Sequence, residues 1–409
     1  MLVQLISNTP LQPSPSEHYT IMFSHLAALS CLLGAHQALA APPSTYLNWK
    51  TFKAKGVNLG GWLHQEAVID PAFWSQYGGN ALDEWDLCAN LGSRCGPVLE
   101  QRYATFIQPA DIDKLAAAGI NVLRIPTGYN AWVKVPGSAL YTGRQVDYLK
   151  SISSYAIAKH GMHVIVDIHS LPGGLNGMGL GGREGYYDWF LNQTALNYSY
   201  QAVDAAIAFI QSADYPQGYT LAPINEPVDV RDMSVFGTPA SLTDAGAAWV
   251  LAYFKGVVER VQRVNAKIPI MLQGGFKGEA YWSPSFDAAT PLVFDVHNYY
   301  FAGRPATSDN LPQWICIDAK NAAGDGKFPV FVGEWAIQAT ANNTFASRAA
   351  NLNTGINAWE KYTRGSAYWT YRFSGNAPVD GEGVQGDYWS YETFINQSFI
   401  NPSKGVTCT

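Results

Sequence analysis

Residues 163–169 read HVIVDIH, an aliphatic run that ends in a histidine, and the stretch VDYLKSISSYAIAKHG (146–161) stands just before it. The run is almost continuously apolar, which is typical of a strand buried on both faces of a parallel sheet. The preceding stretch has apolar residues at helical spacing, and Gly161 stands where a helix commonly ends. A helix followed directly by a buried strand indicates a repeating β/α fold.

Strand-like runs of this kind occur eight times along the chain. They are GVNLGGW (56–62), NVLRIPTG (121–128), HVIVDIH (163–169), YTLAPINEP (219–227), PIMLQGG (269–275), LVFDVHNYY (292–300), FPVFVGEW (328–335) and GSAYWTYRF (365–373). Helical patterns between them cover 111–119, 146–161, 194–211, 243–264 and 345–362, with Gly119 as a C-terminal stop and Thr243 with Asp244 as an N-cap.

This alternation predicts an α/β protein of one domain, a (β/α)8 TIM barrel. The alternative is a doubly wound sheet. Such a sheet would carry a glycine-rich phosphate turn after its first strand, and GVNLGGW lacks the GxGxxG spacing.

The first 40 residues are expected to lie outside the barrel. Residues 22–40 (MFSHLAALSCLLGAHQALA) have an apolar run followed by small residues and an Ala38-Leu39-Ala40 site typical of signal peptidase cleavage. The stretch is too short to span a bilayer. We therefore predict an upstream segment plus a secretory signal over 1–40, with translation starting at Met22, and a secreted catalytic barrel over 41–409.

The amino-acid composition indicates which classes of ligand the protein is suited to bind. Of the 409 residues, 47% are hydrophobic and only 14% are charged, which indicates a well-packed globular protein. The formal net charge of −6 offers no basic patch for phosphates, so nucleic acid is not an expected partner. Thirteen Trp and 23 Tyr suit flat ligands such as sugar rings, although most aromatic side chains are core residues in any protein.

Four cysteines remain once Cys31 leaves with the signal. In an exported chain they predict two disulfides with three possible connectivities, of which we favour Cys88–Cys95 and Cys316–Cys408. A zinc site is the alternative, but the chain has no CxxC and no paired histidines near these cysteines. N-glycosylation sequons stand at Asn192, Asn197, Asn342 and Asn396.

Polar residues that close apolar runs are the candidates for chemistry, because reacting groups in such barrels come from the C-terminal ends of the strands. Two glutamates stand out: Glu226 closes the fourth run and Glu334 the seventh. These strands lie on opposing sides of an eight-membered ring, so the two carboxyl groups can meet over its mouth. Retaining glycoside hydrolysis needs such a pair, one acid to protonate the leaving oxygen and one nucleophile, about 5–5.5 Å apart.

The two glutamates must then differ in pKa. We expect an apolar wall and the nearby negative charge to keep Glu226 protonated, and hydrogen bonds from Arg124 and Tyr299 to keep Glu334 ionised. Asn225 is expected to bind the sugar 2-hydroxyl. Taken singly, each polar residue at a strand end also fits an ordinary core role; the other candidates are Glu66, His169, His297 and Trp369.

At these residues the sequence resembles glycoside hydrolase family 5, in its fungal exo-β-1,3-glucanase branch. The motifs are GVNLGGWL with Glu66 beyond it, LRIP, DIHSLPGGLNG, NEP, VHNYY and GEW, and the resemblance runs from about Leu47 to Ile400. It implies an acid/base at Glu226 and a nucleophile at Glu334. It also implies substrate or catalytic contacts at Arg124, His169, Asn225, His297, Tyr299 and Trp369, with Glu66 reaching the terminal glucose.

One stretch departs from that branch. After LPGGLNG the glucanases continue with an aromatic and acidic-polar stretch, whereas this chain has Met178-Gly179-Leu180-Gly181-Gly182. A smaller loop would leave room around the terminal sugar. Residues 83–107 also resemble the fungal rutinosidase branch, whose members remove a disaccharide such as rutinose from a flavonoid glucoside.

Three functions are therefore considered. The first is a β-glucosidase of the exo-β-1,3-glucanase type that releases glucose from β-glucans or β-glucosides; the second is a rutinosidase-like diglycosidase. The third is an inactive carbohydrate-binding barrel. A metal-dependent hydrolase would need carboxylates and histidines at ligand spacing, and the histidines here close different runs. We expect no cofactor, no metal and no membrane anchor, and a monomer that binds a carbohydrate or glycoside.

Overall fold

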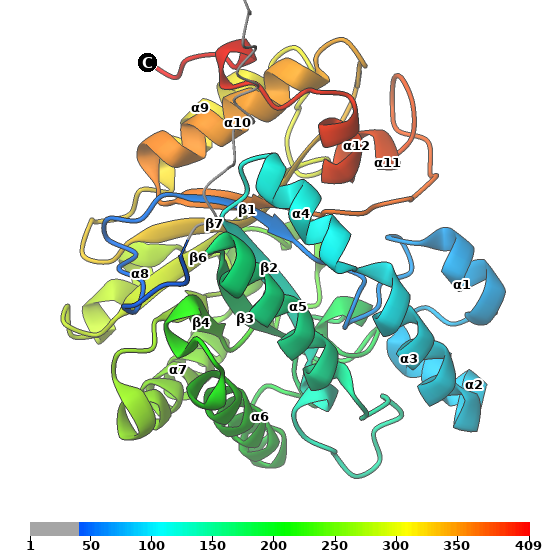
Figure 1. The fold of residues 1–409 in the computed structure, drawn as a ribbon, viewed down its shortest axis with the longest axis vertical. Coiled ribbons are helices and arrows are strands. Elements are labelled where there is room, and N and C mark those ends of the chain that lie inside the picture. The colour runs from blue at the N-terminus through cyan, green and yellow to red at the C-terminus, as the bar shows by residue number, and fades with distance from the viewer. Residues whose placement is uncertain (1–40) are drawn as a thin grey trace, which may run out of the picture. The chain divides into compact units, whose positions relative to one another are not determined.

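Eight parallel strands pair in chain order and close on themselves, because β8 pairs with β1 (Figure 1). The computed structural model describes residues 41–409; the expected signal peptide and the start at Met22 lie outside the described residues. The strands are β1 (Ala54–Asn58), β2 (Val122–Gly128), β3 (His163–Ser170), β4 (Tyr219–Ala222), β5 (Ile270–Gln273), β6 (Leu292–Tyr300), β7 (Val330–Ala339) and β8 (Gly365–Tyr368).

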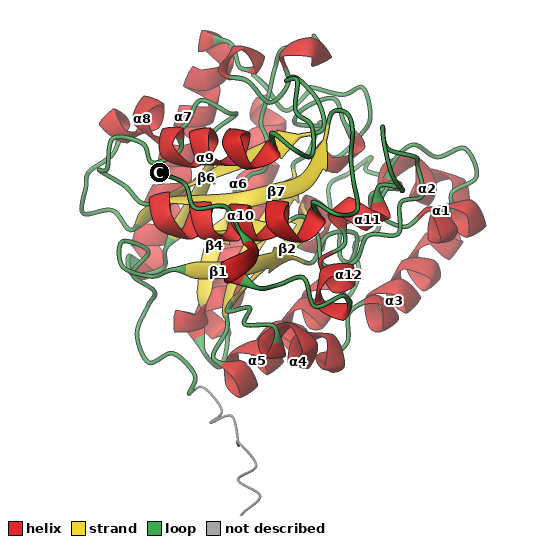
Figure 2. Cartoon of the chain, turned by 90° about the horizontal axis from the view of Figure 1, so that it is seen from above, coloured by secondary structure: helices red, strands yellow, loops and turns green. Residues whose placement is uncertain are grey.

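Helices surround the barrel, as Figure 2 shows from above. They are α1 (Pro71–Tyr77), α2 (Glu84–Leu91), α3 (Cys95–Phe106), α4 (Pro109–Ala117), α5 (Gln145–His160), α6 (Gln193–Ser212), α7 (Asp244–Asn265), α8 (Glu279–Trp282), α9 (Leu311–Asn321), α10 (Arg348–Tyr362), α11 (Gly386–Trp389) and α12 (Tyr391–Asn396). The predicted (β/α)8 barrel is confirmed.

The predicted start of α7 and the predicted end of α5 are confirmed. Thr243 caps α7 by accepting a hydrogen bond from the N–H of Gly246 (3.0 Å), and Gly161 ends α5 in the left-handed conformation (φ 61°). The three helices α1 to α3, which follow β1, were not predicted. They form a helical insertion, here called the α1–α3 subdomain (residues 71–106), which contacts the loop after β3 where Asp83 accepts from the N–H of Glu184.

Several strands are shorter than their apolar runs predicted. β4 ends at Ala222, because Pro223 has no N–H to continue the ladder. β1 ends at Asn58 and β8 at Tyr368. Glu226 consequently lies in the loop beyond β4, not at its last position.

The barrel interior is filled in layers. Each strand contributes one buried apolar residue to a cluster that Trp49 joins, donating from its indole nitrogen to Thr220 (3.0 Å). These residues are Ala54, Val122, Ile165, Ala222, Met271, Val293, Phe331 and Ala367. Two residues further along the same face, β2, β3, β5 and β6 carry buried polar side chains: Arg124, Asp167, Gln273 and Asp295. The apolar layer therefore supports a polar one.

Both favoured disulfides are present in the structure. Cys88–Cys95 closes the turn between α2 and α3, and Cys316–Cys408 ties the C-terminal residues to α9. The asparagines at 197, 342 and 396 are exposed, whereas Asn192 is half-buried and caps α6. Their glycosylation stays a prediction.

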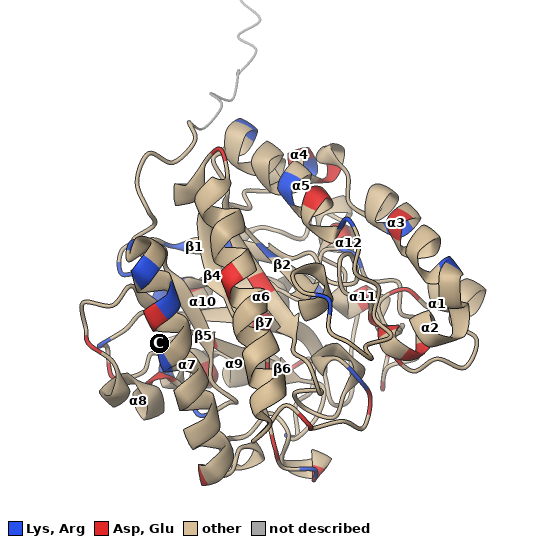
Figure 3. Ribbon diagram, turned by 90° about the horizontal axis from the view of Figure 1, so that it is seen from below, with Lys and Arg blue, Asp and Glu red and all other residues tan. Residues whose placement is uncertain are grey.

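The surface agrees with the low charge of the sequence. Figure 3 shows basic and acidic positions interspersed along the helices. Within residues 41–409, no helix combines the length and the apolar character that a bilayer crossing requires.

Candidate active site

Glu226 and Glu334 meet at the barrel mouth together with His297. One carboxylate oxygen of each glutamate and one ring nitrogen of His297 all lie within 4.8 Å of one another. Glu226 comes from the loop after β4, His297 from β6 and Glu334 from β7, and all three are buried. The convergence predicted for the two carboxyl groups is therefore present.

Glu334 accepts hydrogen bonds on both oxygens. Arg124 Nη1 donates to Oε1 (2.8 Å), and the Tyr299 hydroxyl donates to Oε2 (2.8 Å), as the sequence predicted. Burial alone would lower the pKa of Arg124, but the carboxylates of Asp167, Glu334 and Asp295 outweigh it and raise that pKa above its usual value. Arg124 thus stays cationic beside Glu334.

The peptide that precedes Glu334 is held from both sides. The carbonyl of Gly333 accepts from Asn58 Nδ2 (2.8 Å), and its N–H donates to Asp295 Oδ1 (2.7 Å). Asn58 also accepts from Arg124 Nη1 (3.0 Å). These contacts fix the backbone from which the Glu334 side chain extends.

Glu226 has a polar neighbour, so the expectation of an apolar wall around it is wrong. His297 Nδ1 lies 2.7 Å from Glu226 Oε1 and 3.6 Å from Glu334 Oε2, because β6 delivers the imidazole between the two carboxyl groups. Burial alone would lower the pKa of His297, but Glu334 and Asp295 outweigh it and raise that pKa to about 10. A protonated His297 can donate to Glu226 and moderate the repulsion between the glutamates.

Glu226 also has an unusual backbone, with φ at 48°. Non-glycine residues rarely adopt this left-handed conformation, which persists only where the surroundings impose it. Asn176 Nδ2 donates to the carbonyl of Glu226 (3.2 Å) from the loop after β3. That hydrogen bond helps to fix where the carboxyl group points.

Asn225 is oriented by a chain of side chains. Its Oδ1 accepts from Arg124 Nη2 (2.7 Å), and its Nδ2 lies 3.3 Å from His169 Nε2. His169 Nδ1 is 2.7 Å from Asp167 Oδ2, and burial lowers the pKa of His169 to about 3. A neutral ring that donates to Asp167 leaves Nε2 as the acceptor for Asn225, whose second amide N–H is then free for a sugar hydroxyl. Trp369 is buried and stacks on the His169 ring, with centroids 5.5 Å apart.

Glu66 is half-buried and its Oε1 has no hydrogen-bond partner. Burial, followed by the charges of Glu334 and Glu226, raises its pKa to about 8. The carboxyl group is therefore close enough to both glutamates to sense them, and it holds a proton near neutral pH. An unpartnered polar group beside the site is available to a ligand hydroxyl.

Glu226, His297 and Glu334 also form a group of potential metal ligands, contrary to the expectation that histidines and carboxylates would stay apart. Tertiary folding brings them together from β6, β7 and the loop after β4. However, the Arg124 guanidinium already lies 2.8 Å from Glu334 and His297 contacts Glu226. The positive charge of Arg124 beside Glu334 would repel a metal cation, so the arrangement suits an acid–base pair better than a metal site.

Sequence reasoning missed several residues that shape the site. Each of Asn58, Asp167 and Asp295 interrupts an otherwise apolar strand run, and each is fully or almost fully buried. A buried polar residue in such a run needs a hydrogen-bond partner, so its presence in the sequence could have predicted a role in the site. His64 and Asn176 lie in loops, where no comparable pattern marked them.

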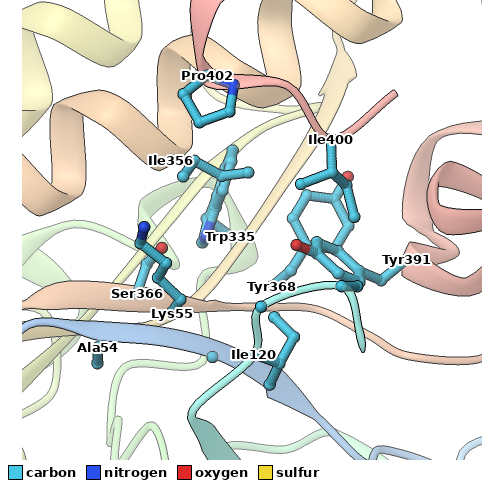
Figure 4. Close-up of a pocket in the computed structure, with 13 residues that line it drawn as sticks. Ala54, Lys55, Ile120, Trp335, Ile356, Ser366, Tyr368, Tyr391, Ile400 and Pro402 are labelled. Carbon is cyan, nitrogen blue, oxygen red and sulfur yellow. The ribbon is translucent and has the colours of Figure 1, made fainter. Parts of the chain in front are cut away.

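A separate cavity of about 220 Å³ lies outside the barrel wall, between β1, β8, α10 and the C-terminal segment (Figure 4). Trp335 lines it together with Tyr368 and Tyr391. Successive strand residues point to opposite faces, so Glu334 faces the interior and Trp335 faces this cavity. None of the residues gathered around the two glutamates lines it.

Comparisons with known proteins identify the family of the chain. Residues 94–375 match the family Cellulase (glycosyl hydrolase family 5). The probable glucan 1,3-beta-glucosidase A of Aspergillus niger is 32% identical over 321 residues, 76% of this chain and 72% of that protein. The probable glucan 1,3-beta-glucosidase of Arthroderma benhamiae is 30% identical over 70% of this chain and 67% of that protein.

Two solved structures are more similar in sequence than these relatives. Rutinosidase from Aspergillus niger is 57% identical, with a TM-score of 0.86. The alignment covers 87% of this chain and 100% of the rutinosidase chain. The chain in the crystal structure of AoRut is 58% identical in sequence, with a TM-score of 0.86. The alignment covers 88% of this chain and 99% of the AoRut chain. The chain therefore belongs to glycosyl hydrolase family 5 and is a glycoside hydrolase.

Proposed function

We propose that the protein is a retaining β-glycosidase that works by double displacement, with Glu334 as nucleophile and Glu226 as acid/base. The observation that supports this most strongly is the distance between the glutamates, whose facing oxygens lie within 4.8 Å. Retaining enzymes hold the two carboxyl groups about 5–5.5 Å apart, whereas inverting enzymes leave about 6.5–9.5 Å for a water molecule.

In the first step, an oxygen of Glu334 attacks the anomeric carbon while the proton of Glu226 passes to the glycosidic oxygen, and the aglycone leaves. Arg124 and Tyr299 hold the attacking carboxylate in place through their 2.8 Å hydrogen bonds. In the second step, Glu226 takes a proton from water, the water oxygen attacks the same carbon, and the bond to Glu334 breaks. Asn225 and His169 face the sugar, where contacts to the 2-hydroxyl strengthen as positive charge develops.

For the substrate, we propose a β-glucoside whose glucose carries a second sugar, such as a rutinoside. The support is the 57% identity to a rutinosidase over its whole length, against 32% identity to a glucan 1,3-beta-glucosidase. The glycine-rich stretch 178–182 favours the same reading, because it offers little side-chain bulk beside the sugar. Exo-cleavage of β-1,3-glucan is the second candidate, favoured by the curated relatives.

We also propose that the protein is a secreted, N-glycosylated monomer. The two disulfides fit an oxidising compartment, and three of the four sequon asparagines are exposed.

The test is to incubate the purified protein with rutin, laminarin and a 4-nitrophenyl β-glucoside and to identify the released sugar. Rutinose from rutin is the expected product, and glucose from laminarin would select the second candidate. Proton NMR at early times should show the β-anomer first. An α-anomer would exclude the retaining mechanism, and inertness towards all three substrates would indicate another glycoside or a binding protein.

A further inference from the structure

The loop after β3, residues 171–190, is here called the β3 loop, and it runs from the substrate site to the α1–α3 subdomain. At its inner end it contacts the acid/base segment: Asn176 donates to the carbonyl of Glu226 (3.2 Å), and the carbonyl of Leu175 accepts from Val228 (3.2 Å). The position of this loop therefore affects how the segment that carries Glu226 is held.

The β3 loop is held internally mainly by backbone hydrogen bonds, such as the one from the N–H of Leu175 to the carbonyl of Gly181 (3.1 Å). Seven of the fifteen residues from 171 to 185 are glycines, and glycine loses more backbone freedom on ordering than any other residue. Side chains that could pack within the loop are correspondingly few. Side-chain contacts from neighbouring elements therefore add to the backbone hydrogen bonds in fixing its conformation.

The outer contact is made by Asp83, the N-cap of α2. Its Oδ1 accepts from the N–H of Asp86 (2.7 Å), the capping contact, and its Oδ2 accepts from the N–H of Glu184 (2.6 Å) in the β3 loop. Glu184 in turn accepts from the N–H of Gly179 (2.9 Å). A Cβ on Gly179 would lie 2.6 Å from the Cβ of Asp83, so glycine is needed for the loop to pack directly on α2.

The middle contact is made by His64. Burial lowers the pKa of His64 to about 3, so the ring is neutral, and Nε2 lies 3.1 Å from the carbonyl of Leu180, to which it can donate. The same ring packs against His169, with centroids 5.5 Å apart. This contact connects the middle of the β3 loop with the residues that orient Asn225.

We propose that Asp83 is a positioning residue that determines substrate specificity. Its hydrogen bond with the N–H of Glu184 holds the β3 loop against α2. This position of the loop keeps space open beside the first sugar, where the second sugar of a diglycoside binds. The inference rests on the proposed diglycosidase function. Because Asp83 is buried and its oxygens accept from the backbone of Asp86 and Glu184, we assign it no contact with the sugar. A substrate with only one sugar does not need that space, so it should respond much less to the loss of this contact.

Two substitutions separate the loop contact from the helix cap. Asp83→Asn and Asp83→Ser both supply good N-cap residues for α2. Asparagine replaces one acceptor oxygen by an amide donor, and serine is too short to hold both partners. Asp70→Asn is the matched control, because Asp70 caps the neighbouring helix α1 by accepting from Phe73 (3.1 Å).

Steady-state kinetics with rutin and with 4-nitrophenyl β-glucoside test the proposal. For both Asp83 variants we expect kcat/KM on rutin to fall about tenfold, mainly through KM, and kcat/KM on the glucoside to change less than about twofold. Hydrogen–deuterium exchange should rise in peptides covering 176–186. Asp70→Asn should leave the ratio of the two kcat/KM values unchanged.

The outcomes are distinguishable. If the wild type releases rutinose but both Asp83 variants keep its substrate ratio and its exchange pattern, the role of Asp83 is wrong and the proposed function stands. If the wild type releases no rutinose, the diglycosidase function is wrong, and the specificity role of Asp83 falls with it. Equal losses on both substrates would show a general folding role, which also overturns the proposal.

Discussion

The carboxylate of Asp295 accepts a hydrogen bond from the backbone N–H of Gly333, the residue directly before Glu334 (2.7 Å). Its other oxygen lies 3.4 Å from His297 Nε2 and 3.7 Å from Arg124 Nε. One buried carboxylate thus connects the strand of Glu334 with the histidine beside Glu226 and with the arginine that holds Glu334. Residues outside the sugar contacts therefore fix the relative position of the two glutamates.

Gly333→Ala should disrupt this arrangement. A Cβ at position 333 would lie 2.2 and 2.3 Å from the two Asp295 oxygens, so Asp295 must move. We expect kcat on 4-nitrophenyl β-glucoside to fall at least about a hundredfold and the free energy of unfolding to fall by about 1–3 kcal/mol. Gly386→Ala is the control, because its nearest atoms lie 3.2 Å away. Unchanged kcat in a folded Gly333→Ala protein would contradict the role given to Asp295.

Tyr299→Phe removes one of the two hydrogen bonds to Glu334 without a large change in volume. Because the hydroxyl donates to Oε2 (2.8 Å), we expect kcat to fall about ten- to a hundredfold. Tyr300→Phe is the matched control, since Tyr300 follows on the same strand and points to the opposite face. Equal kinetics for the two variants would show that the Tyr299 hydroxyl does not support the reaction.

Glu226→Ala should affect the two chemical steps differently. With a good leaving group the first step needs little protonation, so the glycosyl-enzyme should form and accumulate. Azide needs no general base and should restore turnover on 4-nitrophenyl β-glucoside with a β-glycosyl azide as product. Glu334→Ala should lose turnover and yield no β-glycosyl azide. An α-configured azide product from Glu226→Ala would reverse the assigned roles.

Glu66 should make stability depend on pH. Its pKa is raised to about 8 in the folded state. Between about pH 5 and about pH 8 the folded protein therefore keeps a proton that the unfolded chain has released, and the free energy of unfolding falls as pH rises. Denaturant unfolding of Glu66→Gln should show a smaller fall across this window. The exposed Glu259→Gln variant should behave as the wild type, and a wild-type-like fall in Glu66→Gln would refute the assignment.

The two disulfides should contribute unequally to stability. Cys316–Cys408 spans 92 residues and Cys88–Cys95 spans 7. Loop-closure entropy predicts a loss of about 4.6 kcal/mol for Cys316→Ser with Cys408→Ser, and of about 2.3 kcal/mol for the other pair. Urea unfolding of both double variants measures this. The reverse order would show that native contacts of the short loop outweigh chain entropy.

The sequence by itself determined the barrel, because eight apolar runs separated by helical patterns leave few other ways to bury both faces of the strands. It also located Glu226 and Glu334, since carboxylates that close apolar runs are conspicuous. It could not place strand ends, as β4 shows: the run continued to Pro227, but Pro223 ended the hydrogen-bonded ladder.

The tertiary structure alone decided how the site is held together. The side chains of Asp295, Asn58 and Asn176 act on Glu334 and Glu226 from positions 39 to 276 residues away in the chain, and no local pattern encodes such distances. His297 likewise reaches Glu226 only because the closed barrel brings the ends of separate strands to one mouth. Local periodicity fixes which residues are buried, but barrel closure and buried hydrogen bonding fix which of them meet.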